Sequence, residues 1–117
     1  MEVTHLLEFS DRTQLRQWFE QNHDTARQCW VLCSRAKVPP PGVLPYVVVV
    51  EEALCFGWID STQKRIAQGR CAQRLSPRRP RSHWTELNKQ RCAELERRGL
   101  MTDAGRRALA NAQCSIL

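Results

Sequence analysis

The segment from Gln28 to Ser34 constrains the fold more strongly than any other part of the chain. It is too short for a typical helix, it contains β-branched and aromatic residues, and its apolar side chains stand at successive rather than alternating positions. Such a pattern is typical of a strand that is buried on both faces. We therefore expect residues 28–34 to form the central strand of a sheet.

A β-hairpin is predicted after residue 57. Residues 58–66 have the composition of an extended strand, residues 67–69 form a turn that ends in glycine, and residues 70–75 return as a second strand. The predicted hairpin therefore disfavours a helix bundle as the fold. Near the N-terminus, the short apolar stretch from Leu6 to Phe9 either pairs as an edge strand or packs on the body of the domain.

Four helices are predicted from start and stop signals. The segment from Val47 to Leu54 is the hardest, because four consecutive valines favour a strand, whereas Pro45 at the first helical position and Gly57 beyond the end favour a helix. We predict a helix, with Val47, Val50 and Leu54 on one stripe. The others are expected from Ser10–Asp11 to about Asn22, from the N-cap Ser82 to Gly99 with Trp84, Leu87 and Leu95 near one face, and from the N-cap Thr102 to about Asn111.

These elements form one α+β domain over residues 1–117, with helices packed on a small, mostly antiparallel sheet of about three strands. A chain of 117 residues leaves no room for a second independent core. Prolines interrupt the longest uncharged stretch, residues 38–50, so we expect no membrane insertion. The N-terminus lacks the pattern of a secretory signal, and we expect a cytoplasmic protein.

The six cysteines are expected to be free thiols. Only Cys29 and Cys33 are close in sequence, no Cys-x-x-Cys pair is present, and the three histidines are scattered. Most of the cysteines have apolar neighbours, where a thiol behaves as a small hydrophobic group. We therefore predict no metal site and no cofactor.

The excess of positive charge is concentrated in residues 64–81. The chain has 18 Lys and Arg residues against 12 Asp and Glu, a net charge of +6, and residues 64–81 contain no acidic residue. This charge favours anionic partners. The basic segment 64–81 is either a solvated face or a surface that binds phosphate or nucleic acid.

Three segments of the sequence form motifs, and both their order along the chain and the gaps between them carry information. Residues 52–60 read Glu-Ala-Leu-Cys-Phe-Gly-Trp-Ile-Asp, residues 73–85 read Gln-Arg-Leu-Ser-Pro-Arg-Arg-Pro-Arg-Ser-His-Trp-Thr, and residues 99–105 read Gly-Leu-Met-Thr-Asp-Ala-Gly. With these phrases the chain resembles the YdeI/OmpD-associated family, also called bacteriocin-protection proteins. The resemblance implies envelope association and resistance to antimicrobial peptides or bacteriocins, and it implies no reaction. It also implies that a longer helical C-terminal portion of the family is missing from residues 1–117.

Several side chains in and near these phrases are candidates for a ligand site. Pro77 stiffens the chain between strand and helix, so that nearby guanidinium groups are preorganised for a phosphate or carboxylate. The amides of a helix that begins near residue 82 would supply a second anion-binding element. The candidate ligand-binding residues are Asp60, Arg74, Arg78, Ser82, Trp84 and Asn88.

Each candidate also has a structural interpretation. Asp60 either orients an arginine towards a ligand or pairs with Arg74, Ser82, Thr85 or backbone amides to lock the sheet to the next helix. Trp58 and Trp84 either belong to the core or stack a base. Asn88 bonds either Asp60 or a ligand amide.

The sequence predicts a small binding module for an anionic small molecule or an acidic protein surface. A net charge of +6 would repel cationic peptides, so an effect on antimicrobial-peptide tolerance or envelope stress would be indirect. The alternative is nonspecific nucleic-acid binding through residues 64–81. We assign no catalytic residues, because the sequence has no glycine-rich phosphate loop, no His-Glu-x-x-His and no Gly-x-Ser-x-Gly motif.

Overall fold

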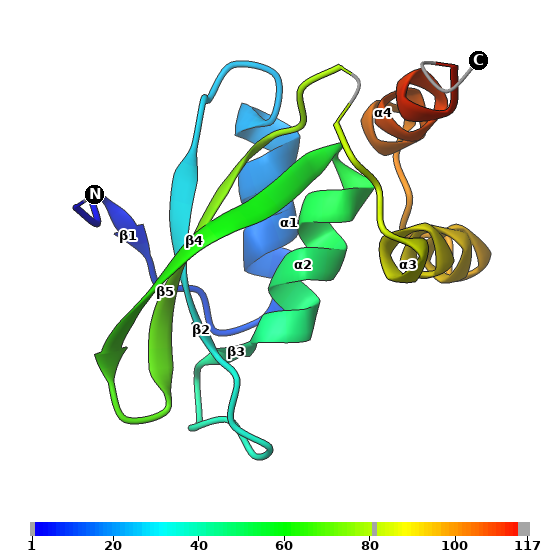
Figure 1. Ribbon diagram of the computed structural model, residues 1–117. Coiled ribbons are helices and arrows are strands. Elements are labelled where there is room, and N and C mark those ends of the chain that lie inside the picture. The colour runs from blue at the N-terminus through cyan, green and yellow to red at the C-terminus, as the bar shows by residue number, and fades with distance from the viewer. Residues whose placement is uncertain (1, 81, 115–117) are drawn as a thin grey trace.

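The computed structural model describes residues 2–80 and 82–114 of the chain (Figure 1). The predicted central strand is β2 (Cys29–Ser34), and all of its residues are buried. It pairs in parallel with β1 (Leu6–Leu7) and β3 (Leu44–Pro45), and antiparallel with β5 (Arg70–Pro77). β4 (Trp58–Ala67) pairs with the other side of β5. The described chain therefore has the predicted α+β fold.

The sheet has five strands rather than about three, and it is mixed although mostly antiparallel. The two additional strands, β1 and β3, have only two residues each. A strand of this length leaves no alternation of apolar and polar residues for sequence analysis to detect. Of the two interpretations of residues 6–9, the edge strand is confirmed for residues 6–7.

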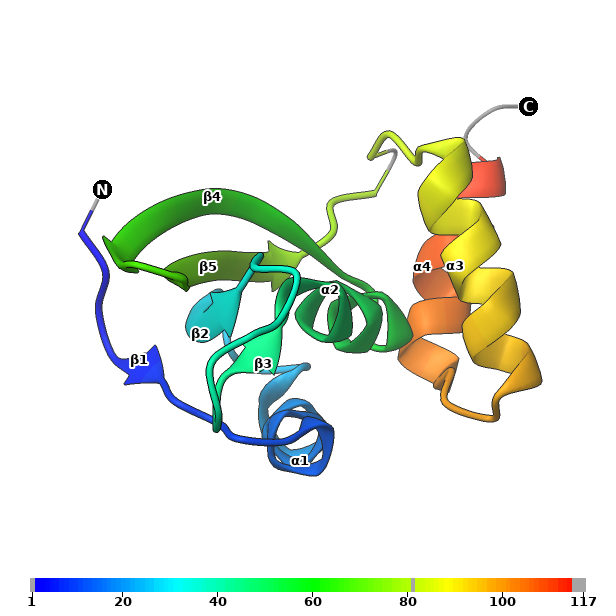
Figure 2. The ribbon, with the colours of Figure 1, turned by 90° about the horizontal axis from the view of Figure 1, so that it is seen from below.

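The predicted hairpin is formed by β4 and β5. Gly69 in its turn has a φ of +71°, a conformation that favours glycine. Two irregularities in register, between Asp60 and Gln63 and between Arg65 and Ala67, interrupt the ladder. Such irregularities bend and twist a strand, and Figure 2 shows the hairpin arching over β2 and one of the helices.

All four predicted helices are present. The one from the valine-rich segment is α2 (Tyr46–Cys55), and Gly57 follows it with a φ of +77°, as predicted for a helix stop. Pro45 is the N-cap of α2 rather than its first helical residue. The other helices are α1 (Arg12–Asn22), α3 (Glu86–Arg97) and α4 (Asp103–Cys114).

The predicted N-cap of α3 at Ser82 is wrong. Thr85 caps this helix, and its hydroxyl accepts a hydrogen bond from the backbone N–H of Asn88 at 3.1 Å. Residues 82–84 precede the helix without regular structure, so Trp84 lies in the connecting segment, where it is buried. Leu87 was predicted near the apolar face of this helix, but it is 55% exposed.

The helices form two groups around the sheet (Figures 1 and 2). α1 and α2 lie against one sheet face, whereas α3 and α4 contact α2 on the side away from β2. α2 is therefore the element that joins the sheet to the C-terminal helices.

Aromatic side chains occupy the centre of the core. Phe19 stacks on Phe56 with ring centroids 5.2 Å apart, and Trp58 meets Trp18 and Phe19 edge to face. Trp58 is 1% exposed, which confirms its interpretation as a core residue.

The buried stripe of α2 differs from the predicted one at its first position. Val50 and Leu54 are buried as predicted, but Val47 is 44% exposed and Val49 is buried instead. Val47 lies in the first turn of α2, which borders an open hollow rather than the core.

A close backbone contact joins α2 to α4. The backbone N–H and hydroxyl of Thr102 both donate to the carbonyl of Cys55 at the end of α2. A Cβ on Gly105 would lie 2.5 Å from the same carbonyl oxygen, so only glycine fits there. Thr102 was predicted as the N-cap of α4, and its hydroxyl accepts a hydrogen bond from the Gly105 N–H at 3.4 Å.

Five cysteines lie among the residues whose side chains are described, and each is a free thiol. Cys114, the sixth, has a side chain outside this set. Within the described chain, no helix is long and apolar enough to cross a membrane.

Candidate functional site

Three of the six candidate residues come together after β5. The guanidinium carbon of Arg78 lies 3.7 Å from the ring centroid of Trp84, which places the cation over the aromatic face. Arg78 Nη1 donates to the hydroxyl of Ser82 at 3.4 Å and to the carbonyl of His83 at 3.3 Å. Arg78 thus holds the segment before α3 against the body of the domain.

The backbone fixes the position of Arg78. Its N–H donates to the carbonyl of Gly57 at 3.0 Å, and Pro77 limits the backbone angles immediately before it. The Nε atom of Arg78 and the Nε1 atom of Trp84 are both buried and have no hydrogen-bond partner in the described part of the chain. Both groups therefore retain an unused donor.

The charge of Arg78 is not neutralised by a direct ion pair among the described residues. Burial lowers the pKa of Arg78, and the more distant carboxylate of Asp60 partly opposes this effect. A half-buried guanidinium without an adjacent carboxylate is costly unless another anion satisfies it. The site therefore favours an anionic ligand.

A small cavity opens beside Arg78. Its volume is about 190 Å³, and two further arginines, Arg79 and Arg107, contribute to its wall together with Asn111. Arg79 and Arg107 are exposed, and neither forms an ion pair with a described residue. We call Arg78, Arg79 and Arg107 the arginine corner.

The acidic residue that is closest in sequence to Arg107 forms an ion pair outside the arginine corner. Asp103, in the first turn of α4, pairs with Arg106 at 2.8 Å, and Arg106 also pairs with Glu96 at 2.6 Å. No acidic residue lines the cavity of the arginine corner. Three positive side chains therefore surround one small space.

Most of the chain matches a known family of sequences. The model of a family described as a domain of unknown function, DUF8412, matches residues 7–108. The chain belongs to this family. No curated protein and no solved structure matches the chain.

In this DUF8412 domain, Asp60 has a different partner from those predicted. The hydroxyl of Tyr46 donates to Asp60 Oδ2 at 2.6 Å, and burial together with this acceptor raises the pKa of Tyr46. In the described structure, the carboxylate of Asp60 accepts no hydrogen bond from the side chains of Arg74, Ser82 or Thr85. Asp60 joins β4 to the first residue of α2 rather than to α3.

Arg74 lies outside the arginine corner. Its Nε donates to Gln28 at 2.7 Å and its Nη1 to Ser61 at 3.2 Å. It pairs in register with Trp30, so these two side chains share a sheet face, whereas the next residue, Leu75, points to the core on the other face. Arg74 is therefore held by Gln28 and Ser61 on the sheet, and it does not line the cavity of the arginine corner.

Asn88 bonds within its own helix. Its side-chain oxygen accepts a hydrogen bond from Arg91 Nη1 at 3.0 Å, and the described structure shows no bond from it to Asp60. Trp84 is 6% exposed and belongs to the core cluster, so one face is covered by the protein and the other by Arg78. Neither residue lines the cavity of the arginine corner.

The basic segment 64–81 is divided among several places in the DUF8412 domain. Lys64, Arg65 and Arg70 lie on the hairpin, Arg74 lies on the sheet face, and Arg79 lies at the arginine corner. Arg81 lies outside the described residues. Among the described residues, no group of three His, Cys, Asp or Glu side chains is arranged to hold a metal ion.

Sequence reasoning missed Arg107 and Tyr46. Arg107 reaches the corner only because the Gly105 contact docks α4 beside the end of α2. Tyr46 meets Asp60 only because α2 packs against β4, fourteen residues along the chain. The one signal in the sequence was the glycine of the Thr-Asp-Ala-Gly phrase at residues 102–105, because a glycine in a helix allows another backbone, here the end of α2, to approach closely.

Proposed function

We propose that this DUF8412 domain binds a small anionic ligand at the arginine corner. The observation that carries the proposal is the convergence of three arginines, without a carboxylate, on one cavity. Arg78 is held in place by Trp84 and Ser82, so little conformational freedom is lost when it meets an anion. Arginine is suited to phosphate and carboxylate because its donors form a planar fork.

The size of the cavity limits what enters it. Pockets that enclose a whole small molecule usually have volumes of about 300–1,000 Å³, whereas the corner offers about 190 Å³. A phosphate, sulfate or carboxylate group fits this space, and the remainder of the ligand or partner stays outside. The ligand is therefore the anionic group of a small molecule or of an acidic protein surface.

The cellular role in this proposal comes from the resemblance to the YdeI/OmpD-associated family. It is an indirect role in tolerance of antimicrobial peptides or of envelope stress. Direct capture of cationic peptides is disfavoured by the net charge of +6.

Titration with inorganic phosphate and with sulfate at constant ionic strength tests the proposal. Amide chemical shifts should change at residues 78–84 and 104–111, and ligand at about 100 times its dissociation constant should stabilise the fold by about 2.7 kcal/mol. The double variant Arg79→Gln, Arg107→Gln should lose most of this response. The control Arg27→Gln, Arg97→Gln removes the same charge away from the corner and should keep it.

Two results would contradict the proposal. One is an equal loss of response in both double variants, which would show a general charge effect. The other is a response spread over residues 64–80 that requires a phosphate polymer and falls steeply with salt, which would favour the nucleic-acid alternative.

A further inference from the structure

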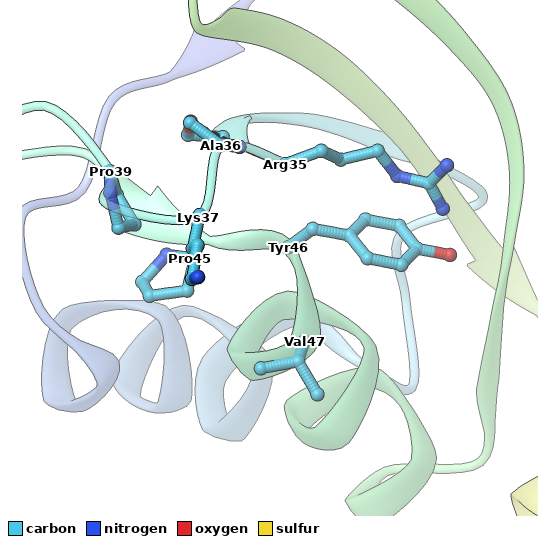
Figure 3. A pocket seen from close by; sticks show the side chains of 8 residues that line it. Arg35, Ala36, Lys37, Pro39, Pro45, Tyr46 and Val47 are labelled. Atoms are coloured by element: carbon cyan, nitrogen blue, oxygen red, sulfur yellow. Dashed lines mark hydrogen bonds between the residues drawn. The ribbon is translucent and has the colours of Figure 1, made fainter.

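An open hollow lies between the β2–β3 connection and the first turn of α2 (Figure 3). Its volume is about 610 Å³, within the range of pockets that hold a whole small molecule. Two cations, Arg35 and Lys37, line it together with Tyr46 and apolar side chains. We call it the β2–β3 hollow.

The guanidinium of Arg35 is positioned by its neighbours. Its central carbon lies 3.8 Å from the ring centroid of Tyr46, and Figure 3 shows the two side chains running alongside each other. The ring itself is fixed, because the Tyr46 hydroxyl donates to Asp60 at 2.6 Å. Arg35 is thus held by stacking, which leaves the edge of its planar fork available to a ligand.

The charge of the β2–β3 hollow is not compensated. Neither Arg35 nor Lys37 forms an ion pair with any described residue. No acidic side chain lines the hollow, and the first turn of α2 contains no acidic residue. The nearest carboxylate that the contacts show is that of Asp60, which accepts from the Tyr46 hydroxyl and neither lines the hollow nor pairs with Arg35. The positive charge of Arg35 and Lys37 would therefore attract a negatively charged group into the hollow.

The remaining wall is mainly apolar. Pro39, Pro45 and Val47 line the hollow, and Val47 is 44% exposed although it stands in a valine-rich helix. Prolines and a valine offer rigid surface at little cost in side-chain entropy. Burial of this surface would favour a ligand with an apolar body.

We propose that the β2–β3 hollow binds a small organic carboxylate with an apolar body. The guanidinium of Arg35 binds the carboxylate, and the apolar body lies against Pro45 and Val47. The flexible side chain of Lys37, whose ammonium group lies beside Pro45, adds positive charge at the other end of the hollow. Inorganic phosphate has the charge but lacks the apolar body, so it binds more weakly.

This site is separate from the arginine corner. The hollow contains the first residues of α2, whereas the corner adjoins Gly57 after its last turn. A helix of ten residues is about 15 Å long. Failure of one site therefore leaves the other proposal intact.

The probe for the test is 2-naphthoate, with 2-naphthamide as its neutral isostere and inorganic phosphate as the anion without an apolar body. Titrations followed by amide chemical shifts should show 2-naphthoate perturbing residues 34–37 and 45–47. The amide and phosphate should bind at least about tenfold more weakly. Equal affinity for naphthoate and naphthamide, equal affinity for phosphate, or shifts centred elsewhere would each overturn the proposal.

Variants then assign the contacts. Arg35→Gln should weaken 2-naphthoate binding by at least about tenfold, and Lys37→Gln should weaken it by a smaller factor. Arg27→Gln is the control, because Arg27 precedes β2 and Arg35 follows it, at opposite ends of the strand. Tyr46→Phe keeps the stacked ring but loses the bond to Asp60, so it should weaken binding by a few fold. An unchanged affinity in folded Arg35→Gln would contradict the proposal.

Discussion

Glu52 is a fully buried carboxylate, at 0% exposure, in the middle of α2. It accepts hydrogen bonds from Arg12 at 2.7 Å and from Arg16 at 3.1 Å, and both arginines come from α1. Arg16 also donates to the carbonyl of Leu100, at the start of the connection to α4. One buried charge thus links three parts of the chain.

Glu52→Gln should destabilise the fold by roughly 3 kcal/mol, because it keeps the shape of the side chain but removes the one carboxylate that pairs with Arg16 among the described residues and one of the two that pair with Arg12, the other being Glu51. Urea unfolding measures the loss. Glu94→Gln is the control, since Glu94 forms an exposed pair with Arg97 whose removal should cost less than about 1 kcal/mol. Equal midpoints for the two variants would show that the buried pairs contribute little.

Arg78 has a structural role as well as its proposed binding role. Arg78→Ala should lower the unfolding free energy by about 1–2 kcal/mol, because it removes the stacked cation and two hydrogen bonds that hold residues 82–84. Arg78→Lys keeps the charge but loses the planar stack, so it should recover only part of the stability. Thermal and urea unfolding without added anion distinguish this role from binding, and wild-type stability in Arg78→Ala would exclude it.

At the scale of elements, the α2–α4 contact reverses the change in stability that is usually expected when a glycine in a helix is replaced by alanine. Helix propensity alone predicts that Gly105→Ala stabilises the fold by about 1 kcal/mol. We expect instead a loss of about 2 kcal/mol or more, because the new Cβ would lie 2.5 Å from Cys55 O and 2.8 Å from Leu54 O, which are backbone atoms. The sign of the change in urea midpoint decides between the two effects.

Elements with local signals could be predicted from the sequence. Asp11 caps α1 by accepting from the Gln14 N–H at 2.9 Å, and Gly57 and Gly69 adopt the positive φ expected of a helix stop and a turn. These features depend on neighbouring residues only. The buried strand β2 was equally easy to predict, because its apolar residues are consecutive in the sequence.

Features that depend on packing could not be predicted. The N-cap moved from Ser82 to Thr85 because Arg78 and Trp84 hold the preceding segment against the body, and nothing in the local sequence shows this contact. Of the candidate site, Arg78 and Ser82 were placed together correctly, since they are four residues apart. Arg74 was not, because its orientation depends on the register of β5 with β2.

At the scale of the whole molecule, the cysteines differ in their exposure to reagents. Burial raises the pKa of Cys29 and Cys33 to about 12, so at pH 8 roughly one in ten thousand of these thiols is ionised. Cys71, which pairs in register with Cys33, is the only incompletely buried thiol among the five whose side chains are described.

Iodoacetamide at pH 8 should therefore label Cys71 of the folded protein well before Cys29, Cys33, Cys55 and Cys92. Peptide mapping by mass spectrometry measures the order of labelling. In urea without a reducing agent, all six cysteines should react, because we expect free thiols throughout. A count of four or fewer, or equally fast labelling of Cys33 and Cys71 in the folded state, would contradict this prediction.

The placement of the four tryptophans also lets fluorescence report on two different parts of the molecule. Trp30 and Trp58 are each 1% exposed, so their emission shifts to the red only when the core itself opens to water. Trp84 instead lies under the guanidinium of Arg78, and its emission responds to any displacement of that cation. Replacing Trp84 by phenylalanine would leave the fluorescence of Trp18, Trp30 and Trp58, and the difference between the two spectra would follow the arginine corner without an added label.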